Sequence, residues 1–428
     1  MQLVTLDGSP EDVGRTLGEL WRADLAADTE DFFARMAEEG LDEELLLRES
    51  RPYRRRIADL APHMLEEMLA TAEAAGVPEE RFVAYQGLKY TFPQRVYKRD
   101  DWVEPREGCT SFMAIGEASG IAANLVHKNR DADMVPQSAH IKQIDGGRRV
   151  LGGGDVGHIG LCHALNADGL AGKTNSGNGV DTPLRHSIST TEILRHVVEQ
   201  CSTCDEALER MRDLSAAGLI TNGTGGCIWL FADREQGLIV EEVPFKLKWR
   251  FVEDEVEARG NEFKLPGMRE EAPDTPRYAT AIARMRELAG RAMPEDLNAL
   301  SRSTANHPTS ICHAKTNSAT TSVVPFDRST PPYWEMAVGH PNNTCYLPMS
   351  PAMPGLPRPV VDGSLWRLSE RLFAANPVGA HPRLAMEEME TRFRHRHAAA
   401  HGPMEMAGAL TQSVRELQVA LQQAVRPE

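Results

Sequence analysis

Apolar residues recur at three- and four-residue intervals through the first quarter of the chain. The stretch EDVGRTLGELWRADLAADTEDFFARM, residues 11–36, places Leu, Trp and Phe at this spacing among acids and arginines. The stretch YRRRIADLAPHMLEEMLATAEAAGV, residues 53–77, does the same and ends at Gly-Val-Pro, a helix stop signal. This periodicity is typical of helices with one buried face. We therefore predict a helical unit over residues 10–90.

From residue 109 the pattern changes to short β-like runs separated by Gly, Asp and Asn. The first six runs are TSFMAIG (110–116), GIAANLVHKN (120–129), AHIKQI (139–144), RRVLGGG (148–154), GLCHALN (160–166) and GLAGKTN (169–175). Five more are CIWLFAD (227–233), GLIVEEV (237–243), KLKWRFV (246–252), TSVVPF (321–326) and YWEMAV (333–338). The first two of these five form a predicted hairpin, joined by Asp-Arg-Glu-Gln-Gly.

Helical patterns interrupt and follow the strands. We predict one helix from Ser187 to about Leu214, opened by Ser-Ile-Ser-Thr with Glu192 completing a capping box. A second is predicted around PRYATAIARMRELAG, residues 276–290. The tail from about residue 363 is helical again, and we expect its amphipathic last helix to pack on the core or on a second subunit, which makes a homodimer plausible. The fold class is therefore α+β with a strand-rich middle.

Composition excludes several classes of partner. The chain has 428 residues and a formal net charge of −15, whereas nucleic-acid and anionic-membrane partners call for clustered basic residues. The sequence contains no apolar run of membrane-spanning length. Its first residues, MQLVTLDGSPEDVG, lack the pattern of a secretion signal. Seven cysteines in so long a chain are too few for a disulfide scaffold. We expect reduced thiols and a cytoplasmic location.

One cysteine stands at an unusual boundary. In EPREGCTSFMAIG, residues 104–116, a polar approach ends at Gly108 and a strand-like run begins at Cys109. A thiol at the first position of a new chain can use its own α-amino group, with a pKa near 8, as general base. Its attack on the preceding carbonyl would create that terminus, and Gly108 tolerates the strained backbone that the attack requires. The alternative is a small buried hydrophobe at a strand start.

Six motifs in one order extend this interpretation. They are EGCTSF, HKNRDAD, ADGLAGKTN, LFADREQGLIVEEV, RGN and HPTSICHA. Their order resembles the isopenicillin N acyltransferase-type family (peptidase family C45) of N-terminal nucleophile hydrolases, which are relatives of choloylglycine hydrolase and penicillin V acylase. The resemblance covers roughly residues 10–345 and leaves the C-terminal part of the chain unexplained.

The resemblance implies roles for particular residues. Cys109 matches the nucleophile and Gly108 the end of the smaller chain after self-cleavage. Asp131 matches the aspartate that orients the new α-amino group, a task that suits a carboxylate. Asn261 matches the amide donor to the oxyanion, and Asn175 a polar residue on a strand end facing the nucleophile. For Asp131, Asn261 and Asn175 the alternative is an ordinary turn, loop or strand-end residue.

The chain departs from the family at one position. Where many relatives read Ser-Ile-Cys-Arg, this chain has His313 in place of the arginine. An arginine is permanently charged, whereas a histidine near neutral pH is only partly charged. The substitution puts in doubt the charge of the site and of its substrate, and the cleavage step itself. Lys128 and Arg130 flank Asp131 and are candidates to compensate, although we expect one of them to be a solvated strand-edge charge.

Metal chemistry is not expected. The CSTC stretch, residues 201–204, has no second pair at zinc-finger spacing, and RHRH, residues 394–397, carries arginines that would repel a cation. We expect helix-face packing for the first and a solvated basic face for the second. A metal-dependent amidohydrolase is disfavoured because no His/Asp cluster has the required spacing.

The resemblance implies a four-layer αββα sandwich of the N-terminal nucleophile type. Its expected parts are a helical prosegment over residues 1–108, a catalytic core over 109–360 and a helical extension over 361–428. The implied reaction is cleavage or transfer of an acyl group from a small linear amide or thioester, without metal or organic cofactor. The alternative is an uncleaved, catalytically silent relative that acts as a binding or scaffold protein.

Overall fold

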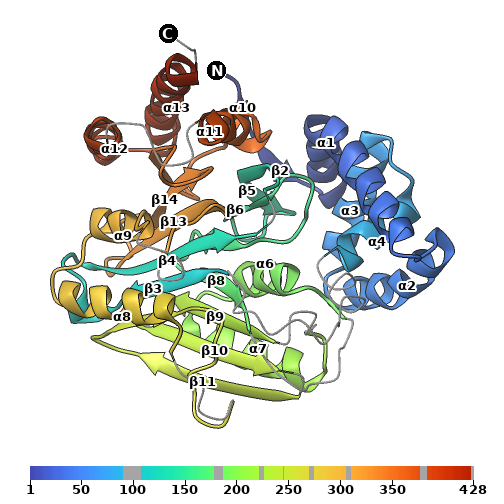
Figure 1. Ribbon diagram of the computed structural model, residues 1–428, viewed down its shortest axis with the longest axis horizontal. Coiled ribbons are helices and arrows are strands. Elements are labelled where there is room, and N and C mark those ends of the chain that lie inside the picture. Colours follow the sequence, from blue (N-terminus) through green and yellow to red (C-terminus); the bar gives the residue numbers. More distant parts are fainter. Residues whose placement is uncertain are drawn as a thin grey trace.

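The elements of the chain follow the predicted order of helices, strands and helices (Figure 1). The computed structural model describes residues 1–89, 108–132, 134–177, 187–220, 226–243, 245–268, 274–304, 310–375 and 383–425. Its N-terminal helices are α1 (Pro10–Glu38), α2 (Glu43–Leu60), α3 (Pro62–Ala75) and α4 (Glu79–Leu88). The structure also has two short strands before α1 that the sequence pattern did not predict, β1 (Leu3–Val4) and β2 (Leu6–Gly8).

The middle of the chain forms two large sheets. In spatial order, the eight-stranded sheet consists of β11 (Lys246–Val252), β10 (Gly237–Val243), β9 (Cys227–Ala232), β8 (Ala171–Ser176), β7 (His163–Asn166), β6 (Val150–Asp155), β5 (Gln137–Ile144) and β2. The six-stranded sheet consists of β12 (Val256–Arg259), β3 (Thr110–Ala114), β4 (Ala123–Asp131), β13 (Thr316–Pro325), β14 (Tyr333–Val338) and β15 (Tyr346–Met349). Neighbouring strands are antiparallel except β2, which runs parallel to β5. The predicted hairpin is present as β9 and β10.

The two sheets stack face to face. Part of the space between them is apolar, because one buried cluster takes Met113 and Val126 from the smaller sheet and Leu230 from the larger one. Elsewhere the contact is polar, since Lys173 on β8 donates to the hydroxyl of Thr320 on β13 at 2.6 Å. Side chains at alternate strand positions therefore meet in the middle of a sandwich.

Helices cover both outer faces of the sandwich. The larger sheet is covered by α6 (Thr190–Gln200) and α7 (Cys204–Ala216), and the smaller one by α8 (Pro276–Leu288) and α9 (Pro294–Ser301). Thr275 caps α8, which begins with Pro276 as the sequence predicts. The predicted fold class, α+β with two stacked sheets between helical layers, is confirmed.

One helix predicted from the sequence forms two separate helices in the structure. Ser189 and Glu192 form the expected capping box at the start of α6. The backbone of Cys201 is extended, and the side chain of Thr203 then caps α7 by accepting from Glu206 N at 3.2 Å. The single helix predicted over residues 187–214 was wrong because a second N-cap lies within it.

The tail packs on its own chain. Its elements are β16 (Leu356–Pro357), α10 (Arg358–Val361), α11 (Ser364–Ala375), α12 (Arg383–Ala398) and α13 (Pro403–Val425), of which the helices are drawn in orange to red in Figure 1. The apolar face of α13 joins the main core through Leu410, Leu417 and Leu421. The first of the two predicted destinations of this helix is thus observed. Within the described part of the chain, no helix is both long and apolar enough to cross a membrane.

Candidate active site

The Gly108–Cys109 bond is buried at the entrance to strand β3. Both residues are buried, with 9% of Cys109 exposed. Strand β3 lies between β12 and β4 in the smaller sheet, so groups from two neighbouring strands reach this position. The predicted polar approach, residues 104–107, lies outside the described residues.

Sheet register brings Asn261 to this bond. In the antiparallel pair, Arg259 at the end of β12 lies opposite Ser111, so the chain after β12 passes the residues before β3. A Cβ placed on Gly108 would lie 2.8 Å from Asn261 Nδ2 and closer still to Oδ1. The amide of Asn261 therefore contacts the α-carbon of Gly108, and a larger residue at 108 would displace it.

Hydrogen bonds fix both ends of this amide. Asn261 Nδ2 donates to the carbonyl of Ser176 at 2.8 Å, and Asn261 Oδ1 accepts from the guanidinium of Arg277 at 2.7 Å. The backbone N–H of Asn261 donates to Glu262 Oε2 at 3.0 Å. The sequence analysis did not identify Arg277 as a site residue. A cation in the first turn of a helix is unfavourable next to the positive end of the helix dipole, and this feature could have singled it out.

Asp131 lies on the other side of Cys109, at the end of β4. The Cys109 thiol is 4.0 Å from the Asp131 backbone oxygen. The Asp131 carboxylate is fully buried, and Oδ1 accepts from the Thr316 hydroxyl at 2.5 Å. His313 Nε2 lies 3.1 Å from Oδ2. The predicted nucleophile, aspartate and substituted histidine are thus brought together.

The hydrogen bond at Nδ1 of His313 determines which ring nitrogen carries the proton in the neutral form. His313 Nδ1 accepts from the backbone N–H of Lys315 at 3.3 Å, so the neutral ring carries its proton on Nε2, facing Asp131. The contact with Asp131 has the distance of an ion pair without the alignment of a hydrogen bond. A neutral imidazole can thus present a positive N–H dipole where an arginine would present a full charge.

Asn175 is engaged in joining the two sheets. Its Nδ2 donates to the carbonyls of Arg259 and Gly260, at 3.2 and 3.0 Å, and its Oδ1 accepts from Ser111 Oγ at 2.8 Å. Both amide hydrogens therefore hold the segment that carries Asn261. A direct catalytic role of Asn175 stays a prediction.

Lys128 and Arg130 both lie in the interior. Their exposed fractions are 2% and 5%, so the expectation that one of them is a solvated strand-edge charge was wrong. Arg130 pairs with Asp155 at 2.5 Å, and Lys128 Nζ donates to the carbonyl of Thr174. Alternate residues of β4 point between the sheets, which is why both cations are buried there.

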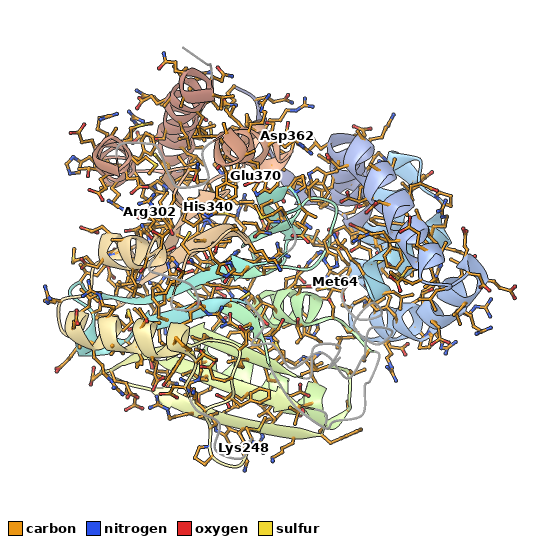
Figure 2. The ribbon with its side chains drawn as sticks, viewed as in Figure 1. Met64, Lys248, Arg302, His340, Asp362 and Glu370 are labelled. Atoms are coloured by element: carbon orange, nitrogen blue, oxygen red, sulfur yellow. The ribbon has the colours of Figure 1, made fainter. Side chains whose placement is uncertain are left out.

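The C-terminal extension contacts the segment that carries His313. His340 Nε2 lies 3.2 Å from the His313 carbonyl oxygen, and its ring stacks on Phe373 of α11 at 4.2 Å. Nearby, Arg302 forms a buried ion pair with Glu390 of α12 at 2.5 Å. Figure 2 shows His340 and Arg302 where the sandwich meets the C-terminal helices. The sequence analysis expected the tail to pack on the core or on a second subunit and did not identify these contacts.

Among the described residues, no group of three or more His, Cys, Asp or Glu side chains is arranged to hold a metal ion. Cys201 and Cys204 are both buried, and they lie at the end of α6 and at the start of α7 rather than on one helix face.

Comparisons with known proteins give only distant likenesses. No family model matches the chain, and no curated protein matches it. Penicillin V acylase from Agrobacterium tumefaciens is 14% identical over 56% of this chain and 86% of its own, with a TM-score of 0.38. The Caenorhabditis elegans ortholog of N-acylethanolamine-hydrolyzing acid amidase is 14% identical over 51% and 94%, also at 0.38. A mutant conjugated bile acid hydrolase from Clostridium perfringens is 14% identical over 56% and 92%, at 0.36. These values are too low to assign a family or an activity.

Proposed function

We propose that this chain is a cysteine amidohydrolase of the N-terminal nucleophile type, activated by cleavage between Gly108 and Cys109. The observation that carries the proposal is the position of this bond. It lies between the Asn261 amide, which contacts Gly108, and the backbone of Asp131, which lies beside the Cys109 thiol. An amide donor, a thiol and a buried carboxylate are the groups that acyl transfer requires.

Self-cleavage proceeds in two steps. The Cys109 sulfur attacks the Gly108 carbonyl carbon, the C–N bond breaks, and the amide nitrogen takes up the thiol proton. The result is a thioester between Gly108 and Cys109. Water then adds to the thioester and releases the Gly108 carboxylate and a Cys109 that bears both a free thiol and an α-amino group. One water is consumed, and no oxidant or metal is needed.

Turnover uses the new terminus. The α-amino group of Cys109 accepts the thiol proton while the sulfur attacks the carbonyl of a small linear amide. Asn261 Nδ2 donates to the oxyanion, and the buried Asp131 carboxylate orients the ammonium form of the terminus. The amine departs with the proton, and water or an acceptor amine removes the acyl group. If water removes the acyl group the reaction is hydrolysis, which we propose as the main activity. If an amine removes it the reaction is acyl transfer.

Contacts between residues 1–108 and the rest of the chain indicate that this smaller chain would be retained after cleavage. Glu67 of α3 is fully buried and accepts from Arg195 at 2.6 Å and from Lys142 at 2.5 Å. Tyr53 of α2 donates to Glu192 at the start of α6. Residues 1–108 would therefore remain bound after the break.

The test is the intact mass of the denatured protein. We expect two species that divide between Gly108 and Cys109 in the wild type and in the Cys162→Ala control, which removes another buried thiol. We expect one full-length species in Cys109→Ala. The cleaved protein is then assayed on fluorogenic N-acyl aminocoumarins with short, long and aromatic acyl groups.

A wild type that stays full-length for days near neutral pH would overturn the processed-enzyme proposal and favour a binding or scaffold role. Cleavage that persists in Cys109→Ala would overturn the assignment of the nucleophile.

A further inference from the structure

Arg277 stands behind the candidate oxyanion donor. It lies in the first turn of α8, and 7% of the residue is exposed. One guanidinium nitrogen donates to Asn261 Oδ1 at 2.7 Å. Within the part of the chain that the structure describes, no carboxylate forms an ion pair with Arg277 and its Nε has no hydrogen-bond partner. It is therefore a buried cation whose observed partner is a neutral amide.

This contact decides which end of the amide faces which neighbour. If the Asn261 side chain were turned over, its NH2 group would meet the donors of Arg277 and its oxygen would meet the Ser176 carbonyl. Both contacts would then be repulsive. With Arg277 present, Nδ2 gives one hydrogen to Ser176 and retains a second for another acceptor. The neighbouring Gly108 carbonyl carbon is the centre that the thiol attacks in the proposed cleavage.

The charge of Arg277 has a second effect. A guanidinium that is not paired with a carboxylate is costly to bury, and the N-terminal end of α8 adds further positive potential at the same place. The neighbouring Glu262 carboxylate accepts from Asn261 N and Thr275 and lies 3.7 Å from Lys264 Nζ. The energetic cost of placing this positive charge and potential in the interior falls when negative charge develops nearby, as it does on the oxygen of a tetrahedral intermediate. The hydrogen bond to Oδ1 also draws electron density from the amide, which makes Nδ2 a stronger donor.

We propose that Arg277 is a positioning residue that fixes the Asn261 amide and supplies positive charge to the oxyanion. The inference rests on the proposed function and adds to it a group that acts through Asn261. The same arrangement serves self-cleavage and turnover, because the two reactions share the nucleophile and the oxyanion donor.

Self-cleavage provides the assay, because every variant carries its own substrate. The rate constant is measured by intact mass during cell-free synthesis of wild type, Arg277→Lys, Arg277→Gln, Arg277→Met and the control Arg286→Met. Arg286 is exposed on the same helix. We expect Arg277→Met to slow cleavage by about tenfold to a hundredfold, less than the roughly hundredfold to thousandfold cost of losing an oxyanion donor, because Asn261 itself is still present. Arg277→Lys should retain most of the rate, and Arg277→Gln, which can donate without charge, should lie between them.

Three results would overturn the inference. Cleavage of Arg277→Met at the Arg286→Met rate would show that neither the orientation of the amide nor the charge matters. Equal slowing of all three Arg277 variants, with thermal midpoints that fall together, would make Arg277 a packing residue. If wild type and Arg286→Met also stay uncleaved, the proposed function fails and the role of Arg277 fails with it.

Discussion

The imidazole of His313 faces the buried carboxylate of Asp131, with Nε2 3.1 Å from Oδ2, while Thr316 holds the other carboxylate oxygen. The position that the resemblance assigns to an arginine is therefore still filled by a donor toward the aspartate. Because Lys315 N donates to His313 Nδ1, this donor is present in the neutral ring.

Replacement of His313 tests this relationship. His313→Ala would remove the N–H that faces the buried Asp131 Oδ2 without hydrogen-bond alignment, so we expect a loss in the free energy of unfolding below the cost of about 1–3 kcal/mol for a lost buried hydrogen bond. We also expect slower self-cleavage, because the carboxylate is no longer held. His313→Gln retains an N–H donor and should lose less of both. Denaturant unfolding and intact mass measure the two effects, and equal behaviour of Ala and Gln variants would contradict the role of the donor.

The contact between Gly108 and Asn261 predicts that Gly108→Ala is disruptive. The added Cβ would lie 2.8 Å from Asn261 Nδ2 and must push the amide away from its partners. We expect self-cleavage to slow by about tenfold or more, a part of what loss of an oxyanion donor costs. Gly408→Ala is the matched control, because a Cβ there meets no atom within 4 Å. Intact mass over time measures both, and a Gly108→Ala protein that cleaves as fast as the control would refute the prediction.

The buried ion pairs of Glu67 with Arg195 and Lys142 predict which substitution would let the two chains of the cleaved protein separate. Glu67→Ala would leave Arg195 and Lys142 buried without their shared carboxylate, and breaking such a buried ion pair costs about 3–5 kcal/mol. In cleaved protein, residues 1–108 should then dissociate in mild denaturant, which size-exclusion chromatography detects. Glu73→Ala, on the exposed face of the same helix, should leave the chains together. Co-elution of both variants under all such conditions would show that other contacts hold the small chain.

A buried carboxyl at the same interface predicts a pH dependence. Burial raises the pKa of Glu192 from 4.5 to about 7, although hydrogen bonds from Tyr53 and Ser189 oppose the shift. Since the folded-state pKa lies above the unfolded one, this group stabilises the fold fully below the unfolded value. That stabilisation is lost as pH rises through about 7. Burial likewise raises the pKa of Asp155, to about 6, which gives a slope of the same sign.

We therefore expect the free energy of unfolding of the wild type to fall relative to that of Glu192→Gln, by up to about 3 kcal/mol between about pH 5 and about pH 8. Glu209→Gln, at an exposed position of α7, should follow the wild type. Urea unfolding across this range measures the slope. Comparison with Glu192→Gln removes contributions that both proteins share. Buried histidines such as His127 and His158, whose pKa burial lowers to about 3, make stability rise with pH over this window in both proteins. Burial alone would raise the pKa of Glu67, but Arg195 and Lys142 lower it to about 2, so its stabilisation is lost only in acid. A slope that Glu192→Gln leaves intact would contradict the assignment.

Local pattern was sufficient for most elements and for part of the site. Alternation and turn residues predicted most of the strands, although not β12, and the role of Asn261 came from the resemblance and not from local pattern. Cys109 was found because a glycine and a polar segment precede an apolar strand. These signals are local, since each rests on a few consecutive residues.

The sequence could not predict contacts between residues that are distant in the chain. The burial of Arg130 depends on Asp155 of the opposite sheet, and that of Glu67 on Arg195, 128 residues away. The contact of Arg277 with Asn261 requires knowing how α8 docks at the end of β12. Such pairings follow from tertiary packing, which no periodicity encodes. Strands as short as β1 and β2 carry too few residues for a pattern at all.

Strand β2 belongs to the segment before the proposed cleavage site, yet it is an edge strand of the eight-stranded sheet, hydrogen-bonded to β5. Cleavage at Gly108 would thus leave one sheet built from two polypeptides. Refolding of the precursor is a unimolecular reaction, but refolding of the cleaved protein would be bimolecular, with a rate that falls on dilution. Processing would therefore convert a fold that one chain can find by itself into one that is maintained mainly by its resistance to unfolding.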